Sequence, residues 1–161
     1  MTQAKYKYNR KKTLIMGIGN LLMGDEGAGI HVIHQLQEDK ELADIEIIDG
    51  GTGGVQLLDF FLSNDLVILV DAAMDRREPG TMTRLKPIYS QDYPKTMMVH
   101  DIGLKNILDA LHLLGKKPEI LLFTISISKV DKIGMSLSPK IRSVVPRVAE
   151  KIKTYFESVT E

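Results

Sequence analysis

Short apolar runs alternate with amphipathic stretches along most of the chain. Four runs rich in Ile, Leu and Val have the composition of buried strands: Thr13–Gly17, Ile45–Ile48, Leu66–Val70 and Ile120–Ile127. Apolar residues recur at helical spacing in three other segments: Glu26–Lys40, Gly53–Leu62 and Asp101–Leu114. Because predicted strands and helices alternate, the pattern indicates right-handed crossovers and a mostly parallel sheet.

The alternation breaks after the third run. The segment Asp75–Gly80 is too short and too rich in turn residues for a helix, so we expect Thr81–Leu85 to form an antiparallel edge strand. The last segment begins at Ser138-Pro139, a favourable helix start, and we expect Pro146 to kink or interrupt this helix. The prediction is a three-layer α/β fold, with a mostly parallel twisted sheet of about five strands, an antiparallel edge strand and helices on both faces.

Length and composition fit one domain. The chain has 161 residues, and 43% of them are hydrophobic, which is enough to bury a core without disulfides. We therefore predict a single α/β domain over residues 1–161, in which residues 1–12 form a basic, solvated tail. The chain has no cysteine, which excludes thiolate metal sites and a cysteine nucleophile.

Charge and hydropathy restrict the partners. The 21 basic residues balance the 21 acidic ones, so no overall field favours binding to nucleic acid or to an anionic membrane. No apolar run approaches the roughly 20 residues that span a bilayer, and the first residues lack the apolar stretch of a signal peptide. We expect a cytoplasmic protein, and without a heptad repeat or long apolar surface we expect a monomer.

Polar residues cluster where the predicted strands end. In an open parallel sheet, ligands bind beyond the carboxyl ends of the strands, where the winding direction reverses. Residues from four loops are expected at this rim. They are Asn20, Asp25 and Glu26 after the first strand, Asp49–Thr52 after the second, Asp71 at the end of the third, and His100 in the loop that opens the helix before the last strand. We expect all four loops to converge there.

The glycine-rich loop Gly17–Gly27 matches a dinucleotide fingerprint only in part. Leu22 stands where the third glycine would fall, and Asp25 and Glu26 would place two carboxylates at the helix start that should receive a pyrophosphate. Carboxylates at a helix start are often caps, because the helix dipole favours them. The pair therefore indicates either capping or the binding of a cation, and it argues against an anion.

Glu26, Asp71 and His100 together offer two carboxylates and one imidazole. Such a set suits a divalent first-row metal with positions left for water or substrate. Each residue alone has an ordinary explanation as a turn, cap or structural residue. Their expected meeting on one rim favours a shared metal site.

Other catalytic arrangements have weaker support. His31, His34 and Glu38 lie at helical spacing, but they do not form a His-Glu-x-x-His pattern and they alternate with apolar positions, so an exposed helix flank is favoured. The serines lack a Gly-x-Ser-x-Gly turn, and no phosphate-binding Gly-Lys-Thr sequence occurs. A serine hydrolase and a P-loop enzyme are thereby excluded.

With these residues in view, the chain resembles the hydrogenase maturation endopeptidases from about Thr13 to its C-terminal helix. These enzymes trim a C-terminal extension from the large subunit of nickel-iron hydrogenases. The resemblance is carried by Gly17–Gly29, Asp49–Thr52, Val70–Ala72, Glu78–Thr81, His100–Leu104 and Leu137–Pro139. The chain departs from the family at Ser126–Lys129, where relatives often carry a Gly-x-x-Pro segment.

The resemblance implies roles for particular residues. Glu26, Asp71 and His100 match the family's nickel ligands and are the predicted metal-binding and catalytic residues. Asp49 matches a residue linked to activity and is included among the catalytic candidates. The predicted substrate-binding positions are Asn20, Gly50, Gly51 and Thr52.

The function expected from the resemblance is a nickel-dependent endopeptidase. Its partner would be the nickel-loaded precursor of a hydrogenase large subunit, with the nickel supplied by that substrate. Two other classes stay open at this point: a non-catalytic nickel-sensing chaperone of the immature subunit, and a Rossmann-like nucleotide-binding module.

Overall fold

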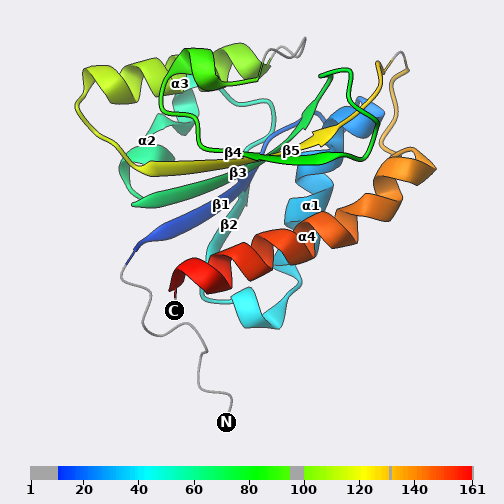
Figure 1. The fold of residues 1–161 in the computed structure, drawn as a ribbon, viewed down its shortest axis with the longest axis horizontal. Helices are drawn as coiled ribbons and strands as arrows, with labels where there is room; N and C mark the ends of the chain where they lie inside the picture. The colour runs from blue at the N-terminus through cyan, green and yellow to red at the C-terminus, as the bar shows by residue number, and fades with distance from the viewer. Residues whose placement is uncertain (1–10, 95–99, 131, 161) are drawn as a thin grey trace.

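The structure, a computed structural model, describes residues 11–94, 100–130 and 132–160, without the side chains of residues 100–102 and 160. Its five strands form one sheet in the order β2-β1-β3-β5-β4 (Figure 1). The strands are β1 (Thr13–Gly17), β2 (Glu46–Asp49), β3 (Leu66–Ala73), β4 (Met82–Leu85) and β5 (Glu119–Ser126). All neighbouring pairs are parallel except β4 with β5, so the predicted mostly parallel sheet with an antiparallel edge strand is confirmed.

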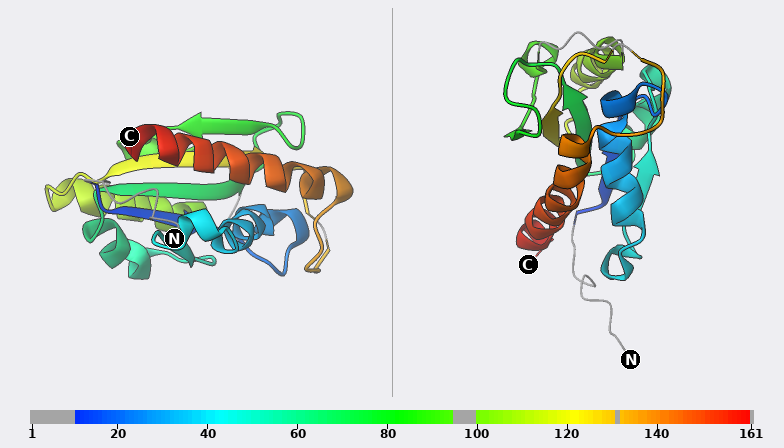
Figure 2. Two further views of the ribbon diagram at one scale, coloured as in Figure 1. Left: turned by 90° about the horizontal axis from the view of Figure 1, so that it is seen from below. Right: turned by 90° about the vertical axis from the view of Figure 1, so that its right-hand side faces the viewer.

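Helices cover both faces of the sheet, as predicted. Helices α1 (Ala28–Gln37) and α4 (Pro139–Thr160) lie side by side on one face (Figure 2). Helices α2 (Leu58–Leu62) and α3 (His100–Leu113) cover the other. Short 3₁₀ turns complete the fold at Gly24–Gly27, Lys40–Leu42, Val55–Leu57 and Ser90–Asp92.

Alternation along β3 separates two hydrophobic cores. Ile68 and Val70 pack into the core under α1 and α4, whereas Val67 and Leu69 pack into the core under α2 and α3. Successive side chains of a strand point to opposite faces of the sheet. Asp71 therefore points to the same side as Leu69, toward the α3 layer.

Two strands differ from their predicted character. The run Ile45–Ile48 was expected to be a buried strand, but β2 is the outer strand next to β1 and its side chains are half-buried or exposed. The third strand does not end before Asp71, because β3 continues in register with β5 as far as Ala73. Asp71 thus lies inside the strand, because the residues before and after it also pair with β5.

Helix α4 passes through Pro146 without a break, so Pro146 does not interrupt the helix, and the alternative of a kink there stays a prediction. Proline removes the hydrogen bond to the carbonyl group of Arg142, four residues earlier. Pro146 and Arg142 are both exposed, and water can satisfy that carbonyl. The apolar face of α4, which includes the buried residues Ile141, Val148 and Ile152, keeps the helix on the sheet.

The predicted basic tail lies mostly outside the described residues, but its last two residues are bound to the domain. The Lys11 ammonium lies 2.8 Å from the Glu119 carboxylate, and the backbone N–H of Lys12 donates to Asp65 at 2.8 Å. Within the described parts of the chain, no helix combines the length and apolar character needed to cross a membrane.

Candidate active site

The direction of winding reverses between β1 and β3. From β1 the chain passes through α1 to β2 on one side, and it then returns to β3 on the other side of β1. The loops that follow β1 and β3 therefore diverge, which leaves a crevice at the carboxyl ends of these two strands in this topology. Figure 1 shows the glycine-rich loop and the connections after β3 and β5 gathered at this end of the sheet.

Backbone hydrogen bonds join the loops that follow the first three strands. The N–H of Ile18 donates to the carbonyl group of Val70 at 2.8 Å. The N–H of Gly19 donates to the carbonyl of Gly51 at 2.9 Å, and the N–H of Gly50 donates to the carbonyl of Gly17 at 2.8 Å. The predicted meeting of these loops is confirmed.

Gly29 allows the first turn of α1 to approach this rim closely. A Cβ atom at this position would lie 2.3 Å from the carbonyl oxygen of Val70 and 2.6 Å from that of Ile18. Both distances are far below van der Waals contact, so only glycine fits between the helix and the two strand ends. The 3₁₀ turn that carries Glu26 is thereby held beside β3.

Glu26 is embedded in the hydrogen bonds of the glycine-rich loop. Its carbonyl group accepts from the N–H of Asn20 at 3.3 Å, and its own N–H donates to the carbonyl of Met23 at 3.1 Å. The side chain of Asn20 accepts from the N–H of Leu22 at 3.0 Å. Asn20 therefore shapes the loop, and its predicted contact with substrate stays a prediction.

Asp71 is a buried carboxylate, with only 1% of its surface exposed. One carboxylate oxygen accepts from the N–H of Ala72 at 2.8 Å, and the other accepts from the Tyr93 hydroxyl at 2.9 Å. Such hydrogen bonds fix the orientation of a carboxylate and offset part of the cost of its burial. These two hydrogen bonds therefore fix the Asp71 carboxylate on the α3 side of the sheet.

Tyr93 is a site residue that the sequence did not reveal. It lies after the 3₁₀ turn Ser90–Asp92, 22 positions from Asp71 along the chain, and only 3% of its surface is exposed. The surrounding segment has no helical or strand periodicity. Its position directly before Pro94 was the sole local hint of a fixed conformation.

His100 is the first residue of α3, so the helix begins one residue earlier than predicted and His100 does not lie in the loop before it. A Cβ atom at Gly103, in the first turn, would lie 2.7 Å from the Cα of Gly54 and 3.0 Å from the carbonyl oxygen of Gly53. The start of α3 therefore packs against the turn that follows β2, at the same rim. The imidazole of His100 is outside the described residues, so its predicted role as a ligand stays a prediction.

The segment after β2 has a well-defined turn. The Asp49 carboxylate is exposed, accepts from the N–H of Gly51 at 2.8 Å and lies 3.8 Å from Nε2 of His34. Gly51 has a φ of +57°, which only glycine adopts without strain, and a Cβ atom there would meet nothing within 4 Å. Gly50 fits closely against Met16 of β1 and against Ile18 in the loop that follows it, whereas Thr52 is exposed.

Asp25 is a cap, but for a different helix from the one that follows it. One of its carboxylate oxygens accepts from the N–H of Ser138 and the other from the Ser138 hydroxyl, both at 2.7 Å. Ser138 directly precedes α4, so the carboxylate satisfies donors at the start of that helix. The same loop is joined to the segment before α4 by a hydrogen bond of 2.7 Å from Gly24 to Gly134.

The competing histidine set does not form a metal site. His34 and Glu38 are exposed as expected, but His31 is half-buried, and its Nε2 atom is inaccessible to solvent and has no hydrogen-bond partner. Burial and the neighbouring His34 together hold the pKa of His31 below its ordinary value. This environment is that of a structural histidine that contacts Met135 in the segment before α4.

The donor set at the rim suits a divalent cation. Glu26 and Asp71 come from segments joined through the loop after β1, and carboxylate oxygens are suitable ligands for first-row divalent metals. The Tyr93 hydroxyl orients one carboxylate in the way that outer residues orient metal ligands. In the described part of the chain, no three potential ligands lie together, and the proposed third ligand is the undescribed imidazole of His100.

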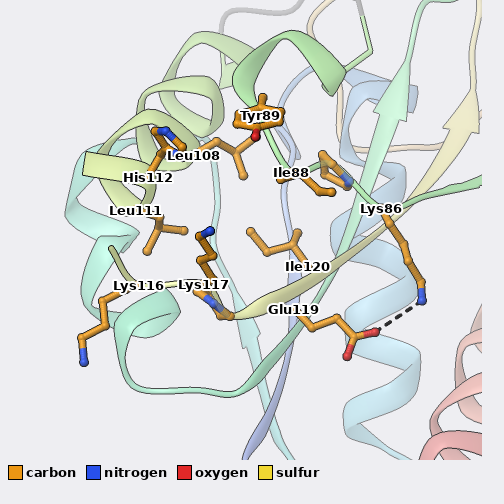
Figure 3. Close-up of a pocket in the computed structure, with 12 residues that line it drawn as sticks. Lys86, Ile88, Tyr89, Leu108, Leu111, His112, Lys116, Lys117, Glu119 and Ile120 are labelled. Atoms are coloured by element: carbon orange, nitrogen blue, oxygen red, sulfur yellow. Dashed lines mark hydrogen bonds and ion pairs between the residues drawn. The ribbon is translucent and has the colours of Figure 1, made fainter. Parts of the chain in front are cut away.

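A separate apolar pocket of about 420 Å³ lies at the opposite end of the sheet (Figure 3). Leu108, Leu111 and Ile120 form part of its lining, and Lys86 at its edge pairs with Glu119 at 3.4 Å. The pocket lies at the amino end of β5, away from Asp71. It therefore belongs to a different surface from the carboxylates of the candidate site.

The doubly wound sheet, with acidic residues at its switch point, defines an α/β enzyme architecture in which loops build the site. The model of the hydrogenase maturation protease family HycI matches residues 30–155. This match covers most of the chain, and the chain therefore belongs to the hydrogenase maturation protease family.

Individual relatives agree with this assignment. The hydrogenase 2 maturation protease of Escherichia coli is 32% identical over 154 residues, covering 92% of this chain and 88% of that protein. The hydrogenase expression/formation protein HupD of Rhizobium leguminosarum is 34% identical over 146 residues, covering 86% and 71%. The solved structure of the hydrogenase maturating endopeptidase HybD from E. coli matches with a TM-score of 0.81 at 25% identity, covering 91% of this chain and 93% of that one.

Family membership decides among the classes that the sequence left open. The protein is a peptidase, and neither a nucleotide-binding module nor a chaperone without proteolytic activity describes its family.

Proposed function

We propose that this protein removes the C-terminal extension from the precursor of a nickel-iron hydrogenase large subunit. We further propose that nickel already seated in the precursor is recognised by Glu26, Asp71 and His100. Nickel is then part of the substrate, and cleavage follows its insertion. Specificity for the mature metal centre would come from ligands on the enzyme that complete the coordination of the metal.

The observation that carries the proposal is the environment of Asp71. A carboxylate with 1% exposure is costly to bury, and here it is placed at the switch point of the sheet with Tyr93 as a fixed donor. The preceding β3 side chains that face α3, Val67 and Leu69, pack in a hydrophobic core. Packing alone would therefore favour an apolar residue at the position of Asp71 as well. A polar group retained at such a cost, in the place where α/β sheets bind ligands, supports a functional role.

The described residues divide the work of peptide hydrolysis. Nickel, when bound, supplies Lewis-acid polarisation of a carbonyl group. We infer that Asp71, held by Tyr93 and by the N–H of Ala72, accepts a proton from the attacking water and returns it to the leaving amine. Glu26 would orient the metal-bearing end of the substrate. The turn at Gly50 and Gly51 provides close backbone approach beside it.

The test is processing of purified nickel-loaded precursor, followed by the mobility or mass of the large subunit. Glu26→Gln, Asp71→Asn and His100→Ala are each expected to lower the initial rate by about 100-fold or more, the usual cost of losing a positioned acid or base. Glu38→Gln changes an exposed carboxylate directly after α1 and serves as the matched control, with a rate equal to wild type. Equal processing by all four variants would exclude the proposed site. A precursor that wild-type protein leaves unshortened would exclude the proposed reaction.

A further inference from the structure

A second pocket opens on the same rim, next to the candidate active site. It has a volume of about 760 Å³ and lies between the connection that follows β3 and the segment that follows β5. Met74, Pro79 and Ile127 provide its apolar walls. Met74 and Ile127 also pack against the core under α1 and α4, whereas Asp71 points to the α3 side, so a polypeptide bound at Asp71 reaches this pocket by crossing the carboxyl end of β3.

The polar lining of this pocket is mainly cationic. Arg76, Arg77 and Lys129 line it, and its single acidic lining residue, Glu78, is paired with Lys140 of α4. The chain as a whole has equal numbers of basic and acidic residues. The positive charge is therefore a local property of this surface and favours a ligand that carries a carboxylate.

The structure defines the backbone conformation of one arginine of the pocket and the side-chain contacts of the other. Arg76 is exposed and has a φ of +65°, the only positive φ among the described residues other than glycine. Arg77 donates to the Thr83 hydroxyl at 2.5 Å, and its guanidinium lies 3.8 Å from Asp75. An arginine in the left-handed region is unfavourable compared with glycine or asparagine, and such strain often accompanies functional positions. A guanidinium with a fixed plane is suited to binding a carboxylate through two hydrogen bonds.

We propose that this pocket, formed around Arg76 and Arg77, binds a carboxylate of the precursor's C-terminal extension. The inference rests on the proposed function, because it assigns a subsite of the same reaction. A pocket of this size accepts a flexible segment of a few residues, whereas the folded body of a large subunit is too bulky to enter it. The body with its metal then occupies the switch point, and the extension that is removed occupies the cationic pocket.

Arg76→Asn is the most direct variant, because asparagine tolerates the left-handed conformation while the charge is lost. The KM for nickel-loaded precursor is expected to rise roughly fivefold, the effect of one partly solvated ion pair, with kcat within about twofold of wild type. Arg76→Lys restores the charge and is expected to recover part of the change. The matched control is Lys117→Gln in the pocket at the opposite end of the sheet, which leaves KM unchanged.

The source of the carboxylate is determined by changing the precursor. Neutralising the acidic side chains of the extension and adding a Gly-Ser segment beyond its terminal carboxylate are tested separately. The change that removes the bound carboxylate raises KM for wild type and leaves the KM of Arg76→Asn unaffected. Rising salt should likewise weaken binding by wild type more than by Arg76→Asn.

A binding measurement separates this inference from the proposed function. Association with immobilised precursor is followed by biolayer interferometry, independently of whether the precursor is shortened. A fivefold weaker Kd for Arg76→Asn supports the subsite even if no cleavage occurs, whereas cleavage by wild type together with equal KM and Kd for Arg76→Asn and Arg77→Gln overturns it. An equal loss in Lys117→Gln also overturns it, because the effect would then be a general one of net charge.

Discussion

The adjacent carboxylates Asp25 and Glu26 are expected to give opposite results when each is removed. The Asp25 side chain accepts two hydrogen bonds of 2.7 Å from Ser138, whereas Glu26 lies on the 3₁₀ turn that faces the switch point. Asp25→Ala should therefore lower stability, and Glu26→Gln should lower activity. Two neighbouring residues with the same charge provide a stringent comparison.

The size of the stability effect follows from the contacts of Asp25. A hydrogen bond to a charged group contributes roughly 1.5–3 kcal/mol, and the loss of a helix cap typically costs about 1 kcal/mol. Because Asp25 is only half-buried, we expect about 2 kcal/mol in total for Asp25→Ala, near the lower end of that range. For a chain of this length, the corresponding decrease in Tm is about 4–8 °C. Asp25→Asn keeps one acceptor oxygen and should lie between the two proteins.

The assay combines urea denaturation with precursor processing well below the transition. Asp25→Ala should process precursor at a rate close to wild type, while Glu26→Gln should keep the wild-type urea midpoint within experimental error and lose activity. The reasoning is refuted if Asp25→Ala unfolds at the wild-type midpoint. A selective loss of activity in Asp25→Ala, at unchanged stability, would assign Asp25 rather than Glu26 to the site.

Three further predictions concern packing, the buried carboxylate and pH. Gly29→Ala forces a Cβ atom against two backbone carbonyls and should lower the free energy of unfolding, measured by urea denaturation, by about 2 kcal/mol or more. The control Gly134→Ala, with nothing within 4 Å of the new Cβ atom, should lower it by under about 0.5 kcal/mol. Equal decreases would contradict the close approach of α1. Tyr93→Phe removes the hydroxyl donor to Asp71 and should cost about 2 kcal/mol and slow processing, so unchanged values for both would contradict the role of this hydrogen bond. Burial lowers the pKa of His31 in the folded state, so the unfolded chain takes up this proton first as the pH falls below about 6.5, and stability should decrease there. His31→Gln should flatten the urea midpoint between pH 7 and pH 5.5, and an undiminished slope would show that another group is responsible.

The sequence was sufficient to predict the layers and the class of sheet. Strand and helix periodicity, and the turn-rich segment Asp75–Gly80, are local signals that persist in the folded chain. The edge position of β2 could not be predicted in this way, because exposure of a strand depends on which neighbours pair with it. The continuity of α4 through Pro146 likewise depends on packing of the opposite, apolar face of the helix against the sheet.

The candidate site was predicted in part. Alternating strands and helices place the ends of β1, β2 and β3 at one rim, so the meeting of the loops that follow these strands could be expected from topology. Tyr93 could not be found, because its hydrogen bond with Asp71 joins segments 22 positions apart and has no periodic signature. The burial of His31 depends on a segment more than 90 positions later in the chain, which sequence spacing does not report.

The glycine-rich loop separates what the sequence determines from what depends on the tertiary structure. The sequence by itself determined that two carboxylates stand at the start of a helix after the first strand, and that a pyrophosphate is disfavoured there. Only the tertiary structure gave Asp25 its partner, Ser138, 113 positions away, whereas the role of Glu26 as a ligand stays a prediction. A cap and a ligand are chemically the same group, and what distinguishes them is which distant part of the chain the fold brings to each.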